Sequence, residues 1–140
     1  MTSCIFCRII GKQVKSYAVF EDEATYAFLD ANPLARGHTL VVPKRHRELL
    51  EELSSEENQH LFTTVHKLLR PIKEALKAPA ETIPINNGRE SGQEVQHVHV
   101  HIIPRFHGDR GGPIHAIMRG RPFVTAREMH QIARRIGTGI

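Results

Sequence analysis

The sequence has little that would place the protein in a membrane or in a disulfide-bonded, secreted scaffold. No apolar run approaches the ~18–20 residues that a helix needs to cross a bilayer. The N-terminus lacks the charged region and long apolar segment of a secretory signal, and only two cysteines occur. We therefore expect a cytoplasmic protein with no membrane partner.

Two signatures of nucleic-acid and nucleotide binding are also absent. The formal net charge is +4, but no stretch forms a basic tract, so a nucleic-acid partner is not expected. The phosphate-binding pattern G-x-x-x-x-G-K-[ST] does not occur. The modest positive charge still suits an anionic ligand such as a nucleotide.

Histidine, by contrast, is abundant, and three of the ten histidines lie in the segment His97-Val98-His99-Val100-His101-Ile102-Ile103. Successive side chains of an extended strand point to opposite faces, so the three imidazoles would share one face and the apolar residues the other. A helix would scatter them. Three histidines in register are hard to explain as core, and we interpret them as a functional site.

The remaining pattern predicts an α+β fold. A long helix should begin after Ser54, which forms a capping box with Glu57, and carry an apolar stripe to Leu76, with a kink or break near Arg70 because Pro71 follows. Short helices are expected at both ends. Strands are expected at 17–20, 25–29, 38–42, 82–86 and 97–103.

Hairpin-type connections between these strands predict one five-stranded, mainly antiparallel sheet. The long helix should cover one face and leave the other free to carry a site. The stretch 105–122, rich in Gly and Arg, should be a surface loop. We expect residues 1–140 to form a single domain.

Three histidines on a strand can do two kinds of chemistry. They can bind a metal, or one imidazole can act as a nucleophile while its neighbours orient protons. The preceding loop favours the nucleophile, because Gly88 and Gly92 let backbone N–H groups approach an anion, and Asn86 and Gln93 add side-chain donors.

The two cysteines form the pattern Cys4-x-x-Cys7, which in a cytosolic chain favours metal binding or redox activity over a structural disulfide. A thioredoxin-like redox motif would follow a strand, and no strand is expected before Cys4. The spacing alone is a weak zinc signal that needs two further ligands.

The segment 97–103 resembles the signature of the histidine triad (HIT) superfamily, His-φ-His-φ-His-φ-φ. The preceding Gly92-Gln93-Glu94-Val95 and Asn86 agree with that family, as do the stretches 28–30, 38–44 and His46. The resemblance covers roughly residues 4–105. It is greatest to prokaryotic HIT-like hydrolases with an N-terminal Cys-x-x-Cys.

The resemblance implies a nucleotide hydrolase or nucleotidyl transferase with no metal in its chemical step. His99 would attack the α-phosphorus of a nucleoside 5′-phosphoryl compound, a phosphoramidate, an adenylate or a dinucleoside polyphosphate. His101, His97 and His38 would line the site, and Asp30 would bind the ribose hydroxyls.

The resemblance also implies the binding sites around that phosphate. Phe6, Ile10 and Phe28 would surround a purine base, and Asn86, Gln93, Val95 and His101 would hold the phosphate. A structural zinc would be bound by Cys4, Cys7, His46 and His97. A homodimer is expected by analogy.

Gln96 replaces a commonly aromatic residue, but the departure from the family pattern that matters is Glu94, which stands where several eukaryotic members have Ser or Thr. A carboxylate there would repel an anion, so it either turns away or meets a cationic leaving group. Two other functions stay open: a purine nucleotide sensor or adaptor, and a metal-dependent hydrolase with all three histidines as ligands.

Overall fold

The structure, a computed structural model, describes residues 3–140. The chain divides into two compact units, Met1–Asp109 and Arg110–Ile140. The single domain expected over 1–140 stays a prediction. Within residues 3–140, no helix combines the length and apolar character needed to cross a membrane.

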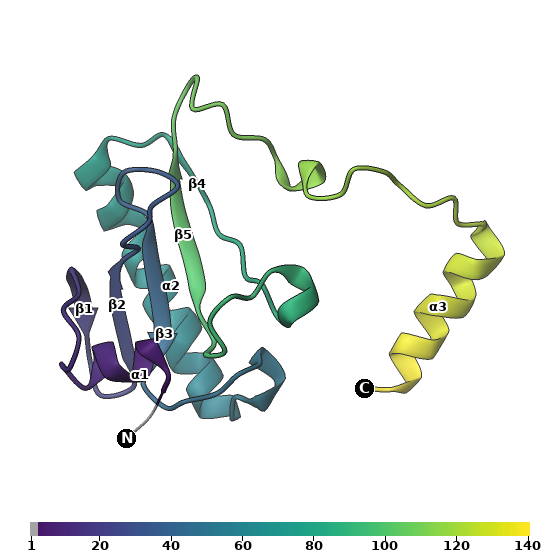
Figure 1. The fold of residues 1–140 in the computed structure, drawn as a ribbon. Helices are drawn as coiled ribbons and strands as arrows, with labels where there is room; N and C mark the ends of the chain where they lie inside the picture. Colours follow the sequence, from purple (N-terminus) through teal and green to yellow (C-terminus); the bar gives the residue numbers. More distant parts are fainter. Residues whose placement is uncertain (1–2) are drawn as a thin grey trace. The chain divides into compact units, whose positions relative to one another are not determined.

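The first unit is built on one five-stranded sheet (Figure 1). Its strand order is β1-β2-β3-β5-β4, and every neighbouring pair is antiparallel. This confirms the predicted α+β class. The strands are β1 (Ala18–Glu21), β2 (Thr25–Leu29), β3 (Thr39–Pro43), β4 (Ala80–Thr82) and β5 (Val100–Arg105).

The long helix α2 (Ser55–Leu76) covers one face of this sheet. It begins at the predicted capping box, in which the Ser54 hydroxyl accepts from the Glu57 N–H and the Glu57 carboxylate accepts from the Ser54 N–H, both at 3.1 Å. Its apolar stripe packs into a buried cluster with residues of β2, β3 and β5: Ala27, Val41, Leu61, Val65, Leu68, Ile72, Val100 and Ile102.

The predicted break near Arg70 is wrong, since α2 continues through Pro71 to Leu76, and the alternative of a kink there stays a prediction. Proline removes one helical N–H, which leaves the carbonyl of Lys67 without its partner four residues on. Pro71 and Lys67 are both exposed, so water can satisfy that carbonyl. Packing of the stripe on either side then holds the helix together.

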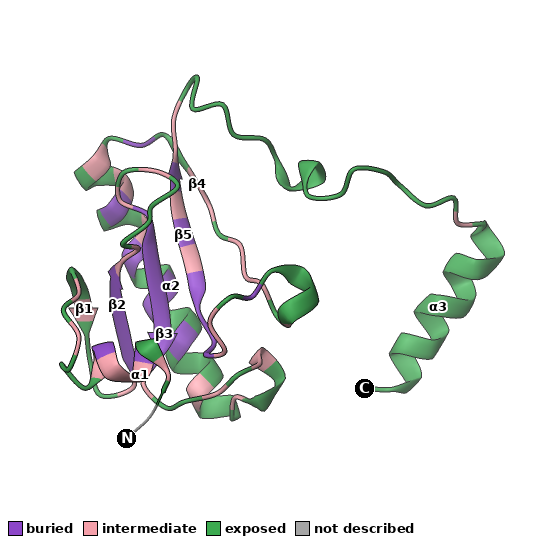
Figure 2. Cartoon of the chain, in the orientation of Figure 1, coloured by how far each residue is buried: buried purple, intermediate pink, exposed green. Residues whose placement is uncertain are grey.

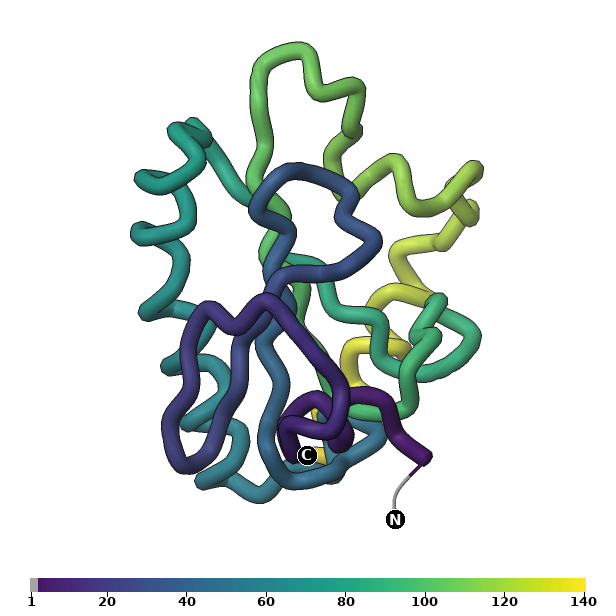
Figure 3. Tube along the Cα trace, turned by 60° about the vertical axis from the view of Figure 1, so that its left-hand side comes forward, coloured from purple at the N-terminus to yellow at the C-terminus, as the bar shows by residue number. Residues whose placement is uncertain are grey.

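The opposite face of the sheet carries a second apolar cluster, formed with the short helix α1 (Ile5–Ile10). Its buried members are Phe6, Ile9, Tyr26, Phe28, Leu40 and Val42. Burial is continuous along β2 and β3, which lie between the two layers (Figure 2). In a second view, α2 lies along one side of the strands and the segment leading into β5 on the other (Figure 3).

The second predicted strand has the expected bounds, the first and third are displaced by one residue, and the fourth and fifth differ by two or more. Strand pairing begins only at Val100, not at His97, and extends through Pro104 to Arg105. Before it, the Val98 N–H donates to the Arg47 carbonyl at 2.7 Å, because β3 ends at Pro43, which has no N–H for a ladder. Residues 83–86 are also irregular, although the His101 N–H still donates to the Pro84 carbonyl at 3.1 Å.

The second unit is an extended segment with a short 3₁₀ turn, Ile114–Ala116, followed by helix α3 (Ala126–Thr138). The Thr125 hydroxyl caps α3 by accepting from the Glu128 N–H. The expected apolar side of α3 is exposed, with Met129, Ile132 and Ile136 at 58%, 44% and 64%.

Candidate active site and metal site

A pocket of about 480 Å³ opens on the face of the sheet that carries α1. Eight of the residues predicted from the sequence line it: Phe6, Phe28, Asp30, His38, Asn86, Val95, His99 and His101. Ile10, Gln93 and His97 lie outside this lining. Eight of the eleven residues predicted for catalysis and nucleotide binding thus line one pocket, and the other three have identifiable positions of their own.

His99 is oriented by the backbone of its own strand. Its Nδ1 lies 2.7 Å from the carbonyl oxygen of His97. A carbonyl can only accept, so Nδ1 carries the hydrogen and Nε2 keeps its lone pair. Burial, the largest effect, lowers the pKa of His99 below its usual value. The residue is 7% exposed and lines the pocket, so it offers a neutral, nucleophilic nitrogen there.

His101 and His38 form a chain of hydrogen bonds with a defined direction. The backbone N–H of Leu34 donates to His38 Nδ1 at 3.1 Å, so the hydrogen of a neutral His38 is on Nε2. That atom lies 2.9 Å from His101 Nδ1, to which it donates. His101 must then carry its own hydrogen on Nε2, which makes it a hydrogen-bond donor for a phosphoryl oxygen.

Both members of this chain are neutral at pH 7. Burial lowers the pKa of His38, although the carboxylate of Asp30 opposes the shift. Burial, with the neighbouring His99 and His38, lowers the pKa of His101 to about 4. The site can therefore hold a phosphate by donated hydrogen bonds rather than by imidazolium charge.

Asp30 lies at the end of β2, where the pocket meets the loop to β3. One of its oxygens accepts from the Asn32 N–H at 2.9 Å, and the other lies 3.7 Å from His38 Nε2. The carboxylate is held in place and keeps lone pairs for the pocket, as a ribose-binding role requires.

Gln93 holds the loop before His97 rather than facing the pocket. Its buried amide oxygen accepts from the Gly88 N–H at 2.8 Å, and its amide nitrogen donates to the carbonyls of Glu48 and Val95 at 2.8 and 3.1 Å. Asn86 lines the pocket and lies beside the same loop, with its amide 3.4 Å from the Gly92 carbonyl.

Sequence reasoning missed several lining residues. Ile9 lines the pocket, whereas Ile10 packs against the second apolar cluster. Ile9 and Ile10 are three and four residues after Phe6, about one helical turn. Helical periodicity places both on the same side as Phe6, so it cannot predict which of them lines the pocket. Lys15, Tyr17 and Leu40 also line the pocket, and only the alternation of Leu40 along its strand was available as a signal.

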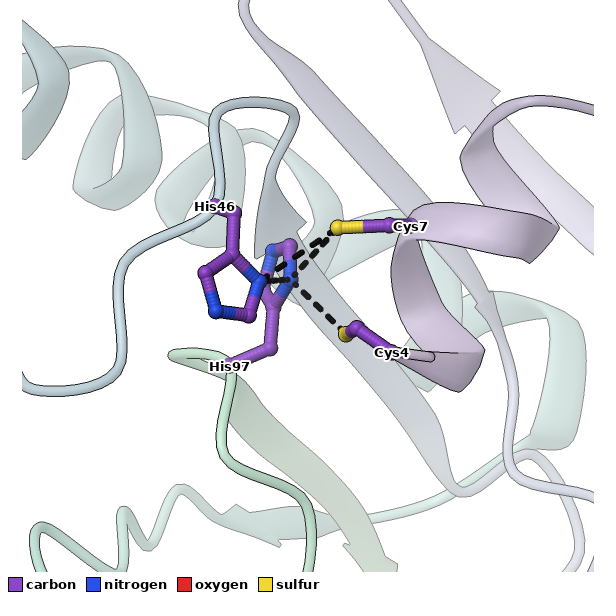
Figure 4. Close-up of side chains that lie close together, drawn as sticks. All are labelled: Cys4, Cys7, His46 and His97. Carbon is purple, nitrogen blue, oxygen red and sulfur yellow. Dashed lines mark hydrogen bonds between the residues drawn. The ribbon is translucent and has the colours of Figure 1, made fainter. Parts of the chain in front are cut away.

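The four residues predicted to bind zinc converge at the other end of the histidine segment (Figure 4). Cys4 and Cys7 come from α1 and the residue before it, His46 from the loop after β3, and His97 from the approach to β5. Their four ligand atoms all lie within 4.8 Å of one another.

The distances in this cluster match a tetrahedral zinc site. His46 Nδ1 and His97 Nδ1 are 3.2 Å apart, and three sulfur–nitrogen distances are 3.4, 3.5 and 3.6 Å. A zinc ion with ordinary bond lengths sets these edges at about 3.4 Å for two nitrogens and about 3.6 Å for nitrogen and sulfur. His97 Nε2 donates to the Pro43 carbonyl at 2.8 Å, which leaves Nδ1 as the free ligand atom.

The three histidines of the segment do not converge on one point. His97 Nδ1 faces the cysteines, His99 Nδ1 its own backbone, and His101 Nδ1 faces His38. A second group of possible metal ligands consists of Asp30, His38 and His101, and it includes neither His97 nor His99. This geometry contradicts the alternative in which all three histidines bind one catalytic metal.

Comparison with known proteins shows which family the chain matches. A family model described as "HIT domain" matches residues 11–108. An uncharacterized HIT-like protein of Methanocaldococcus jannaschii is 48% identical over 106 residues, which is 76% of this chain and 81% of that protein. An adenosine 5′-monophosphoramidase of Saccharomyces cerevisiae is 37% identical over 103 residues, which is 74% of this chain and 63% of that protein.

Solved structures extend the comparison. The crystal structure of a HIT family member from Bacillus subtilis has a TM-score of 0.89 and 33% identity, and covers 99% of this chain and 98% of that one. A zinc-bound histidine triad family protein from Mycobacterium smegmatis has a TM-score of 0.73 and 33% identity, covering 91% and 86%.

Proposed function

This chain belongs to the HIT family, and from that premise we propose that it hydrolyses nucleoside 5′-phosphoryl compounds through a nucleotidyl-His99 intermediate. The compounds share a reacting α-phosphorus and differ in the leaving group. The yeast relative is an adenosine 5′-monophosphoramidase, which supports a purine nucleotide and a phosphorus–nitrogen bond as one substrate type.

One observation carries the proposal: His99 lines the pocket and its Nδ1–H donates to the His97 carbonyl, so Nε2 keeps a lone pair that can attack a bound substrate. In the first step this lone pair forms a bond to the α-phosphorus. The bond from phosphorus to the leaving group breaks, and the leaving group takes the electron pair and a proton from water at the pocket mouth. In the second step water attacks the same phosphorus, and the phosphorus–Nε2 bond breaks with its electron pair returning to Nε2. The proton of the attacking water goes to the hydroxide left by the first step, and a nucleoside 5′-monophosphate is released.

The other residues bind and position. His101 Nε2–H donates to a phosphoryl oxygen, and the chain from Leu34 through His38 keeps that hydrogen on Nε2. Asp30 accepts from the ribose hydroxyls. Apolar side chains of α1 and β2, including Ile5, Phe6 and Ile9, surround the base.

Cys4, Cys7, His46 and His97 would hold a zinc ion with a structural role, because four protein ligands leave no position for a reacting water. They connect α1 to the loop after β3 and to the start of the histidine segment. The zinc-bound relative from Mycobacterium smegmatis supports a metal in this family. The proposal assigns no chemical step to it.

The test is a His99→Ala variant assayed with adenosine 5′-phosphoramidate. We expect the loss of turnover and of the acid-labile nucleotidyl adduct trapped from the wild type, with retained binding of adenosine monophosphate by calorimetry. Wild-type binding without turnover of any substrate class would instead indicate a nucleotide sensor. Unchanged turnover in His99→Ala would refute the mechanism.

A further inference from the structure

Glu94 lies on the rim of the pocket that contains His99. Its backbone is fixed on both sides, because Gln93 is buried with three hydrogen bonds and Val95 packs against the second apolar cluster. Glu94 itself is exposed and lines the pocket. A short, anchored loop thus presents one carboxylate at the pocket mouth.

The charge around the reacting centre is unusual for a site that binds anions. Apart from histidines, the charged lining residues are Lys15, Asp30 and Glu94. Asp30 is held by Asn32 and His38, whereas the carboxylate of Glu94 has no hydrogen bond or ion pair to any other residue in the described part, 3–140.

This arrangement discriminates between leaving groups. The nucleoside side of a substrate is accounted for by Asp30 and the apolar lining, so the free carboxylate at the rim is left for the other side. An anionic leaving group, such as a nucleoside polyphosphate, would be repelled there. A leaving group that carries an ammonium would be attracted there. Glu94 is available for this contact, whereas Asp30, the other carboxylate of the lining, already contacts Asn32 and His38.

We propose that Glu94 is a specificity-determining residue that selects nucleoside 5′-phosphoramidates with a positively charged amine leaving group. This inference rests on the proposed function. The step is unchanged: the phosphorus–nitrogen bond breaks, the amine nitrogen takes the electron pair and a proton from water, and a second ammonium on the same amine pairs with Glu94 throughout.

Three adenosine 5′-phosphoramidates of matched length test this, made from putrescine, butylamine and γ-aminobutyrate. Their distal groups are cationic, neutral and anionic. For the wild type we expect kcat/KM to fall in that order. Glu94→Gln should lower kcat/KM for the putrescine compound and raise it for the γ-aminobutyrate compound, each about two- to fivefold, the range of an exposed ion pair. Glu94→Lys should invert the order.

Glu90→Gln is the matched control, because Glu90 is an exposed acid of the same loop that does not line the pocket. It should leave the order unchanged. Added salt should reduce the preference in the wild type but not in Glu94→Gln, a response that a purely structural role would not give.

The two proposals fail differently. If the wild type hydrolyses all three compounds equally, or if Glu94→Gln keeps the wild-type preference, the role of Glu94 is refuted while the His99 mechanism stands. If the wild type hydrolyses none of them, the proposed function fails and the role of Glu94 fails with it.

Discussion

The titration of His101 predicts how stability depends on pH. The folded protein holds the pKa of His101 at about 4, against 6.5 for a free side chain, chiefly through burial. Between these values the unfolded chain binds more protons than the folded one. The free energy of unfolding therefore rises with pH across this window, and acid destabilises the fold.

The magnitude follows from the two pKa values. Going from about pH 7 to about pH 5, this one histidine should remove about 2 kcal/mol from the free energy of unfolding. His38 shifts in the same direction and adds to the loss. The contribution of His101 is isolated by comparing the wild type with His101→Asn, whose amide oxygen can still accept from His38 Nε2.

Urea unfolding at the two pH values measures the effect. The loss on acidification should be about 2 kcal/mol smaller in His101→Asn than in the wild type. Any release of metal by acid is common to both proteins and cancels in this comparison. His130→Asn, an exposed substitution in α3, should behave as the wild type. Equal pH dependence in the wild type and His101→Asn would refute the assignment of a neutral, desolvated His101.

Three further predictions test the core, the metal site and the ribose site. Leu61→Ala should lower the free energy of unfolding by about 2–5 kcal/mol, because Leu61 lies on the buried face of α2 and is 0% exposed; the neighbouring Phe62→Ala, 40% exposed, should cost clearly less in the same denaturation assay. Cys7→Ser should abolish stoichiometric zinc in the purified protein as measured by mass spectrometry, and a full complement of zinc in the variant would contradict the ligand set. Asp30→Asn should lower kcat/KM for a ribonucleotide substrate at least about tenfold, through lost charge-assisted hydrogen bonds, but leave the dideoxyribose analogue unaffected; equal losses on both would exclude ribose binding by Asp30.

Much of the site was predictable because it depends on period-two alternation along one strand. The positions of His99 and His101 beside the pocket follow from that alternation, as does the burial of Val98 and Val100 on the α2 face. The capping box at Ser54 was equally local, since its two hydrogen bonds join residues three apart.

The sequence-based expectations fail where contacts between distant parts of the chain determine the local structure. Pro71 does not break α2, because its exposed position lets water replace the lost bond. The side-chain amide of Gln93 makes hydrogen bonds with Gly88, Glu48 and Val95. Glu48 is 45 residues away in the sequence, so no local pattern could predict that its carbonyl accepts from Gln93. Strand pairing starts after His97 because the partner strand ends in a proline.

His97 connects the two halves of the site through three different groups. Its Nδ1 faces Cys4, Cys7 and His46, its Nε2 donates to the Pro43 carbonyl, and its own carbonyl accepts from His99 Nδ1. The ring is 0% exposed, so it cannot turn without breaking at least one of these contacts. The backbone carbonyl that orients the proposed nucleophile, at 2.7 Å, thus belongs to the residue whose ring would bind the zinc ion.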